Sequence, residues 1–409
     1  MDRRTFLKGM LAGAATAFLP EVSWSYDDLL NRLAKKGHIS EQKEKFLINK
    51  GNLWYVPSQL RKNQSLDKVV QDKEKFHFVP KDEMVQGIWF YPGFETKIGF
   101  EKNPDVLARR VTDKIYAANY KSLKLLDEFN VNTVYVSALN HFNALDFYAS
   151  KNDRRRHWAD YKTFNHLIET FGLAANDPEL KDKGLKPKEI SILGYEDTVF
   201  LEWDQKKLQK HFRHLIQNTC HFARNYQIDV EPHAMDLKGN YFRNNKESRK
   251  QLIHQYMKLC DTMYHTAEEF NEQFKEQGIN HEVRFIPAVP FIGPPHDVSM
   301  DYHEILKEEG YSGVDAIPCH ELILMSYSDS AEKFYDMCIN LNVEEINTPF
   351  TLASSNFPNV WDPYFKKADE HKDMPRQVKR IQAKNPNCRG YQIFCNLSLM
   401  NKDLPMKGR

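Results

Sequence analysis

The chain has 409 residues, of which 41% are hydrophobic and 28% are charged, so it can bury a sizeable core and is not a disordered chain. Its 57 Lys and Arg residues nearly balance its 56 Asp and Glu residues, which gives a formal net charge of +1. This balance gives no reason to expect a nucleic-acid partner. Every apolar run is shorter than the roughly 20 residues of a membrane helix, so we expect no stable membrane anchor.

The first 25 residues have the pattern of an export signal. A basic start with adjacent Arg3 and Arg4, followed by Phe-Leu-Lys, precedes a weakly apolar stretch at Met10–Leu19. This start resembles a twin-arginine signal, although Asp2 stands where such signals usually have Ser or Thr. An amphipathic N-terminal arm is the alternative. The resemblance implies a bacterial protein that the twin-arginine translocase carries, already folded, to the periplasm or beyond.

Residues 26–83 are polar and rich in lysine, and their few apolar groups favour one or two short helices. We expect this segment to be a helical N-terminal extension. It precedes a main domain that we expect at residues 84–409.

Within this main domain, short β-branched and aromatic runs alternate with longer amphipathic segments. This alternation is typical of βα units with a parallel sheet. The runs cover residues 87–92, 132–139, 189–196, 227–233, 283–291, 321–328, 345–353 and 389–396. Eight such units predict a (β/α)₈ TIM barrel, in the α/β class. A doubly wound open sheet is the alternative, but no glycine-rich phosphate-binding turn follows the first run.

Two of the intervening segments carry further signals. Asp204 is a good N-cap for a helix in which Leu208, Phe212 and Leu215 recur at helical spacing. Residues 236–282 are longer than one barrel helix requires, and their polar part at 238–249 predicts a loop over the site.

Chemistry in such barrels lies at the carboxyl ends of the strands. At the end of the fourth run, Asp229, Glu231 and His233 alternate, so we expect all three to point into the barrel mouth. Two carboxylates on a buried face are costly unless they are paired, and crowding raises the pKa of one of them. A raised pKa is what a general acid requires near neutral pH. A structural acidic pair, bound by backbone groups or arginine, is the alternative.

Two motifs resemble those of known enzymes. Residues 226–234 (YQIDVEPHA) resemble the D-x-E-P motif on the fourth strand of glycoside-hydrolase-like barrels, and Met325-Ser-Tyr327 is similar to the M-x-Y motif of chitinase-type enzymes. The resemblance implies that Glu231 protonates the glycosidic oxygen. It implies that Asp229 orients an acetamido group of the substrate and that Tyr327 helps to hold it. The expected ligand is a carbohydrate or a cell-wall-type small substrate, and no cofactor is expected.

The sequence also departs from these families. Arg224 and Gln227 stand where chitinase-type enzymes have two further Asp residues, and the eighth run ends in Cys395-Asn396 rather than Trp. The seventh run ends without the carboxylate that serves as nucleophile in two-carboxylate retaining enzymes. Substrate-assisted hydrolysis, a second acid from a loop (Asp329 or Asp297) and lost activity are therefore all open.

Other residues at strand ends are candidates for substrate binding. Trp89 and Tyr91 share a face of the first run and can stack on a sugar ring, although packing in the core explains them as well. The candidates for polar contacts with a substrate are Asn140, His141, His233, Asp329 and Asn396. Met325 of the M-x-Y motif is a further candidate for substrate binding.

Two other functions are compatible with these residues. Asp229, Glu231 and His233, completed by His141 or Asp329, could form a metal-dependent hydrolase site. A barrel that binds carbohydrate without cleaving it is the second. The six cysteines contain no C-x-x-C pair, so we expect buried free thiols, with a single disulfide after export as the alternative.

Export is expected to depend on the arginine pair. Replacing Arg3 and Arg4 together with lysine keeps the charge but removes the motif, so the full-length precursor should accumulate in the cytoplasm. Cell fractionation with immunoblotting measures this. Processing and localisation identical to the parent would contradict the twin-arginine assignment.

Overall fold

The computed structural model describes residues 76–90, 126–137, 186–195, 198–232, 246–291, 302–355 and 368–394. The predicted signal segment and most of the predicted N-terminal extension lie outside these ranges. No helix of the described ranges is long and apolar enough to cross a membrane.

Eight parallel strands form a closed barrel in the order β1 to β8, and β1 pairs with β8. This confirms the predicted (β/α)₈ fold and excludes the open sheet. The strands are β1 Val85–Phe90, β2 Thr133–Ser137, β3 Glu189–Tyr195, β4 Ala223–Ile228, β5 Arg284–Pro290, β6 Leu322–Met325, β7 Phe350–Ser355 and β8 Cys388–Phe394.

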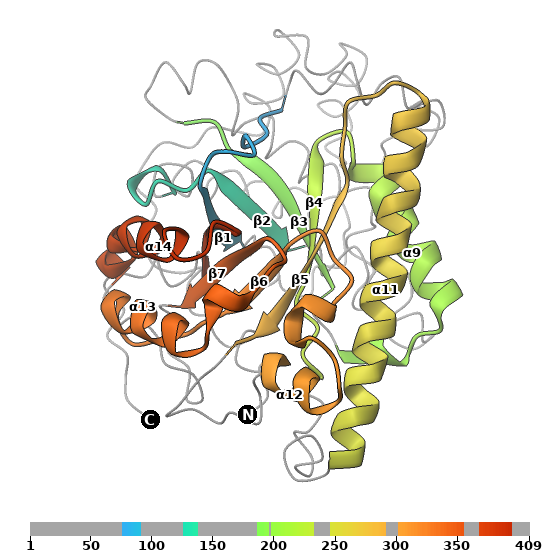
Figure 1. The fold of residues 1–409 in the computed structure, drawn as a ribbon. Helices are drawn as coiled ribbons and strands as arrows, with labels where there is room; N and C mark the ends of the chain where they lie inside the picture. Colours follow the sequence, from blue (N-terminus) through green and yellow to red (C-terminus); the bar gives the residue numbers. More distant parts are fainter. Residues whose placement is uncertain are drawn as a thin grey trace, which may run out of the picture.

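The helices with described bounds lie on the outer face of this sheet and follow strands β3 to β7 (Figure 1). The α-helices are α9 Gln205–Thr219, α11 Lys246–Glu276, α12 Tyr302–Glu308, α13 Ala331–Asn340 and α14 Met374–Gln382. Four short 3₁₀ helices accompany them: η5 Thr198–Glu202, η8 Gly313–Ala316, η9 Val343–Glu345 and η10 Ala368–Asp373. Asp204 caps α9 as predicted, because its side chain accepts a hydrogen bond from the Lys207 backbone N–H at 2.9 Å.

The longest helix, α11, corrects one prediction. Residues 246–249, which we expected in a loop, form its first turn, while residues 238–245 lie outside the described part of the chain. With 31 residues, α11 is about 46 Å long, roughly twice the length of a seven-residue strand. Two ion pairs join its first turns to the end of α12 and the residue after it: Arg249–Glu308 at 3.0 Å and Lys250–Glu309 at 3.2 Å.

Strand β4 begins four residues before the predicted start, at Ala223 instead of Gln227. The sequence Arg-Asn-Tyr-Gln at 224–227 looks too polar for a buried strand. Asn225 and Gln227 nevertheless belong to β4 and lie on the inner face of the barrel, where Asn225 bonds Glu189 and Ser191. Strand β4 also ends earlier than predicted, at Ile228. Asp229 and Glu231 therefore follow the strand instead of lying inside it.

The barrel has two cores, one on each face of the sheet. The outer core packs helices against the strands and contains Ile228 and Val230 of the β4 segment. The inner core fills the barrel with side chains that alternate with the outer ones: Trp89, Tyr135, Leu193, Ile286, Ala288, Ile323, Met325, Tyr327, Ala353 and Phe394. The five cysteines of the described ranges are free thiols, and all but Cys319 are buried.

The seam that closes the barrel depends on a glycine. Gly390 of β8 pairs with Val85 of β1 and has a φ of +154°, a conformation that side-chain-bearing residues rarely adopt. A Cβ atom at this position would lie 1.9 Å from the Val85 carbonyl oxygen. The two strands can therefore close the barrel only if residue 390 has no side chain.

Replacing Gly390 with alanine should lower the free energy of unfolding by about 3 kcal/mol or more, because backbone atoms must move at the seam. Gly278→Ala is the matched control. Gly278 also has a positive φ (+68°), but nothing lies within 4 Å of its added Cβ, so this change should cost only about 1 kcal/mol. Urea denaturation of both variants measures the difference. Equal losses would show that the seam is not tightly constrained.

Candidate active site at the barrel mouth

Asp229 lies at the carboxyl end of the barrel and faces its interior. Its backbone N–H donates to the Tyr195 carbonyl at 2.7 Å, so the chain stays beside β3 for one residue after β4 ends. Ile228 and Val230 on either side belong to the outer core, which places Asp229 on the inner face. The residue is 5% exposed. Glu231 follows two residues later and is half-buried, so both carboxylates come after the carboxyl end of β4.

Tyr327 reaches the same end of the barrel from β6. It is 4% exposed, and its ring lies 6.4 Å from that of Phe394, centroid to centroid. Met325, the last residue of β6, is buried beside it in the inner core. Strands β4 and β6 are separated only by β5, so Asp229 and Tyr327 follow the carboxyl ends of nearby strands.

Trp89 is fully buried, which corrects its assignment as a stacking platform for substrate. Its indole N–H donates to Gln392 Oε1 at 2.7 Å. Its ring packs against that of Phe394 in a T-shaped arrangement, with 4.9 Å between the ring centroids. Gln392 in turn donates to Thr351 Oγ1 at 3.1 Å. The second interpretation given for Trp89, packing in the core, is the one that its burial supports.

Asp329 forms an ion pair with Lys333 at 2.8 Å, across the first turn of α13. As a carboxylate in the loop after β6, it is partly exposed and lies at the mouth end of the barrel. Five predicted site residues and one alternative acid lie outside the described part of the chain, so their assignments stay predictions: Tyr91, Asn140, His141, His233 and Asn396, together with Asp297.

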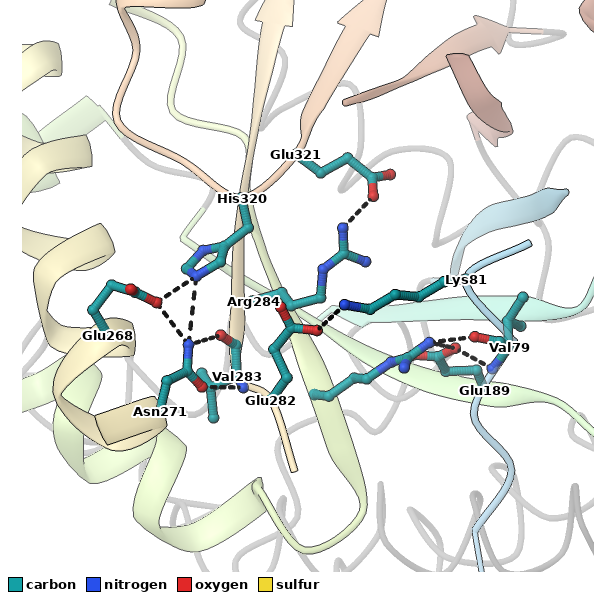
Figure 2. A network of polar contacts seen from close by, with 11 residues as sticks. Val79, Lys81, Glu189, Glu268, Asn271, Glu282, Val283, Arg284, His320 and Glu321 are labelled. Carbon is teal, nitrogen blue, oxygen red and sulfur yellow. Dashed lines mark hydrogen bonds and ion pairs between the residues drawn. The ribbon is translucent and has the colours of Figure 1, made fainter. Parts of the chain in front are cut away.

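At the opposite, amino-terminal end, a second acidic group is held entirely by structural contacts (Figure 2). The Glu189 carboxylate accepts hydrogen bonds from the Val79 backbone N–H at 2.6 Å, from Asn225 at 2.7 Å and from Arg224 at 2.8 Å. Arg224 also donates to the Val79 carbonyl. These bonds bind the segment before β1 to strands β3 and β4 and use the charge of Glu189 for structure.

A further ion pair lies at this end of the barrel (Figure 2). Arg284 of β5 pairs with the buried Glu321 at 2.6 Å. Burial opposes the charge of Arg284, but the Glu321 carboxylate keeps the pKa of the guanidinium above its ordinary value. For Tyr135, burial raises the pKa of the hydroxyl, and the nearby Glu321 and Glu189 carboxylates raise it further. The charges of Glu189, Arg224, Arg284 and Glu321 at this end are therefore paired.

On the outer side of the same end, His320 joins the end of α11 to the start of β5 (Figure 2). His320 Nε2 lies 2.8 Å from Glu268, and Asn271 Oδ1 accepts a hydrogen bond from the backbone N–H of Val283 at 2.7 Å.

Among the described residues, no group of three or more His, Cys, Asp or Glu side chains is placed to hold a metal ion. The metal hypothesis is not tested by this, because His233 and His141 lie outside the described ranges.

Behind the end of β7, Ser354 and His371 form a pair that resembles a nucleophile and its base. Ser354 Oγ lies 3.2 Å from His371 Nδ1, and both side chains are fully buried. Ser354 alternates with Ala353 of the inner core, so it points outward, away from the barrel mouth. The pair therefore stabilises the layer between β7 and η10 and does not reach a substrate.

This pair should make stability depend on pH. Burial lowers the pKa of His371 to about 3, whereas the unfolded chain has an ordinary histidine pKa of about 6.5. The unfolded state therefore binds the proton first, and stability should fall as the pH drops from about 6.5 towards 3. The expected loss is about 2–3 kcal/mol between pH 7 and pH 4.5.

His371→Gln should be less stable at pH 7 but should lose less stability over this pH range. Urea denaturation at several pH values measures the difference between the two proteins, which cancels the contribution of other groups. Parallel curves for parent and variant would refute the role of His371.

Comparison with known proteins gives structural neighbours only. No protein-family model matches the chain, and no curated protein matches its sequence. Solved structures with some likeness include a family 1 β-glucosidase from Thermotoga maritima, at 13% identity and a TM-score of 0.44, covering 78% of this chain and 89% of that chain. A β-glucosidase from Exiguobacterium marinum has 11% identity and a TM-score of 0.42, covering 78% of this chain and 91% of that chain. The assignment of the barrel fold rests on the strand pairing of the chain itself.

Proposed function

We propose that the chain is an exported, glycoside-hydrolase-like barrel that acts on a carbohydrate at its mouth, with Glu231 as the general acid. The observation that carries the proposal is the acidic pair after β4. Asp229 faces the interior at 5% exposure, and Glu231 follows it half-buried. A pair of nearby carboxylates favours a proton on one of them, because two like charges in a partly buried site repel.

In this proposal the proton of Glu231 passes to the glycosidic oxygen as the bond between the sugar and that oxygen breaks. Asp229 orients a polar group of the substrate, and the Tyr327 hydroxyl helps to hold it. Glu231 then recovers a proton from the water that completes the hydrolysis. The electron pair that stabilises the sugar comes from the substrate itself, because β7 ends in Ala353-Ser354-Ser355 and supplies no carboxylate nucleophile.

The same end of β7 favours a second candidate function, a barrel that binds carbohydrate without cleaving it. Asp329, the described loop carboxylate that we considered as a second acid, forms an ion pair with Lys333. A protein of this kind would use Asp229 and Glu231 as hydrogen-bond acceptors for sugar hydroxyls. Turnover of a bound oligosaccharide is the property that separates the two functions.

We further propose that residues 1–25 are a twin-arginine signal and that the folded barrel works in the periplasm or outside the cell. Adjacent Arg3 and Arg4 before a weakly apolar stretch support this assignment. The substrate would then be a carbohydrate met outside the cytoplasm, such as a cell-wall oligosaccharide.

Glu231→Gln keeps the shape of the side chain but removes the proton that it transfers. If Glu231 is the general acid, hydrolysis should fall by about 10²–10⁴-fold while oligosaccharide binding is kept. Asp229→Asn should cost less, because Asp229 only orients the substrate. Release of reducing ends from chitin-type and cell-wall oligosaccharides measures turnover, and calorimetry measures binding.

The outcomes separate the candidates. Full hydrolysis by Glu231→Gln, on a substrate that the parent cleaves, would refute the acid role. Binding without turnover in the parent would identify the non-catalytic barrel. Loss of activity on adding a chelator, equal to the loss in both variants, would identify the metal-dependent hydrolase.

A further inference from the structure

The inner face of β4 is polar along its whole length. Asn225, Gln227 and Asp229 alternate with the outer residues Tyr226 and Ile228, so the three follow one another along the same face towards the mouth. Asn225 has polar neighbours on the adjacent strands, whereas the positions beside Gln227 are apolar. On its two neighbouring strands, Gln227 pairs in register with Leu193 and Ile286, and both belong to the inner core.

Gln227 differs from Gln392, another inner amide, because no group among the described residues bonds it. Gln227 is 1% exposed, and within the described ranges neither its Nε2 nor its Oε1 atom has a hydrogen-bond partner. Gln392 donates to Thr351 and accepts from Trp89. A buried amide without partners costs free energy, so such a group requires an explanation in a native fold.

Asn225, one position below, has a matching unused atom. Its Nδ2 group donates to Glu189 at 2.7 Å and to Ser191 at 3.0 Å, which uses both of its protons. Its Oδ1 atom is buried and has no hydrogen-bond partner in the part of the chain that the structure describes. Asn225 can therefore only accept a further hydrogen bond, while Gln227 can both donate and accept.

We propose that the barrel interior beside β4 is a built water site, in which Asn225 and Gln227 bind ordered water that continues to Asp229. One water accepts from Gln227 Nε2 and donates to Asn225 Oδ1. A second water donates to Gln227 Oε1 and to the Asp229 carboxylate. Residues i and i+2 of a strand have Cα atoms about 6.6 Å apart. A water that bonds one polar atom of each side chain bridges about 5.6 Å between those two atoms. The spacing along the strand therefore suits a bridging water.

Each proposed water has the two polar partners that an internal water requires. The site makes Gln227 a positioning residue, which fixes the orientation of Asp229 through water and does not touch the substrate. Only this last consequence rests on the proposed function, because the water site itself concerns the folded chain without ligand.

The direct test is a crystal structure of the full chain at a resolution that shows ordered water. We expect one water within about 3.2 Å of Gln227 Nε2 and Asn225 Oδ1, and another between Gln227 Oε1 and Asp229. Dry packing around the Gln227 amide, or a direct bond from it to another side chain, would overturn the proposal.

A substitution series tests the same site through stability. Gln227→Leu removes both water contacts and leaves Asn225 Oδ1 without a partner, so Tm should fall by about 1–3 °C. If the amide is instead merely unbonded in a dry core, leucine should suit its neighbours Leu193 and Ile286, and Tm should rise. Gln392→Leu is the matched control. It breaks two direct hydrogen bonds, so its Tm should fall in either case.

The positioning role has a separate readout. In Gln227→Leu the water no longer donates to the Asp229 carboxylate, so Asp229 should titrate at higher pH, as followed by ¹³C NMR with Asp229→Asn as the assignment control. An unchanged titration with a lowered Tm would reduce Gln227 to a structural residue and refute its positioning role. Neither measurement uses a substrate, so failure of the glycosidase proposal would leave both results standing.

Discussion

The fold depends on the burial of one carboxylate, that of Glu189, which is 1% exposed at the amino-terminal end of β3. A buried carboxylate is tolerated only when hydrogen bonds replace its water. Val79, Arg224 and Asn225 supply these bonds from the segment before β1 and from β4. The hydrogen bonds that satisfy this one charge therefore hold together the segment before β1, strand β3 and strand β4 at the amino-terminal end of the barrel.

This arrangement divides the interior into levels. Paired charges occupy the amino-terminal end, where Arg284 bonds Glu321 as well. Trp89, Gln392 and Thr351 form a bonded chain in the middle, surrounded by apolar side chains. The carboxylates at the mouth are thus separated from the structural charges by a packed layer. The polar side chains of β4 interrupt this layer. They extend from Asn225, which bonds Glu189, to Asp229 at the mouth.

The chemistry of the mouth is asymmetric. The fourth strand delivers Asp229 and Glu231, whereas the seventh ends in small hydroxyl side chains, of which Ser354 faces outward to His371. A retaining mechanism requires two carboxyl groups about 5–5.5 Å apart, and the end of β7 does not supply the second. In the proposed function the proton comes from the residues after β4, and the end of β7 supplies no carboxylate as a nucleophile. This asymmetry connects the proposed acid role of Glu231 with the alternative of a barrel that only binds.

The sequence by itself determined the class of fold, because strands buried on both faces require apolar runs and amphipathic helices between them. It also determined the Asp204 cap and the inward alternation of Asp229, which are local properties of the chain. Only the tertiary structure decided the start of β4, the burial of Trp89 and the contrast between Gln227 and Gln392. Trp89 and Gln392 are 303 positions apart, so no local pattern could show that they bond. Whether a polar side chain inside a barrel is satisfied depends on its neighbours across the sheet, and these are set only when the barrel closes.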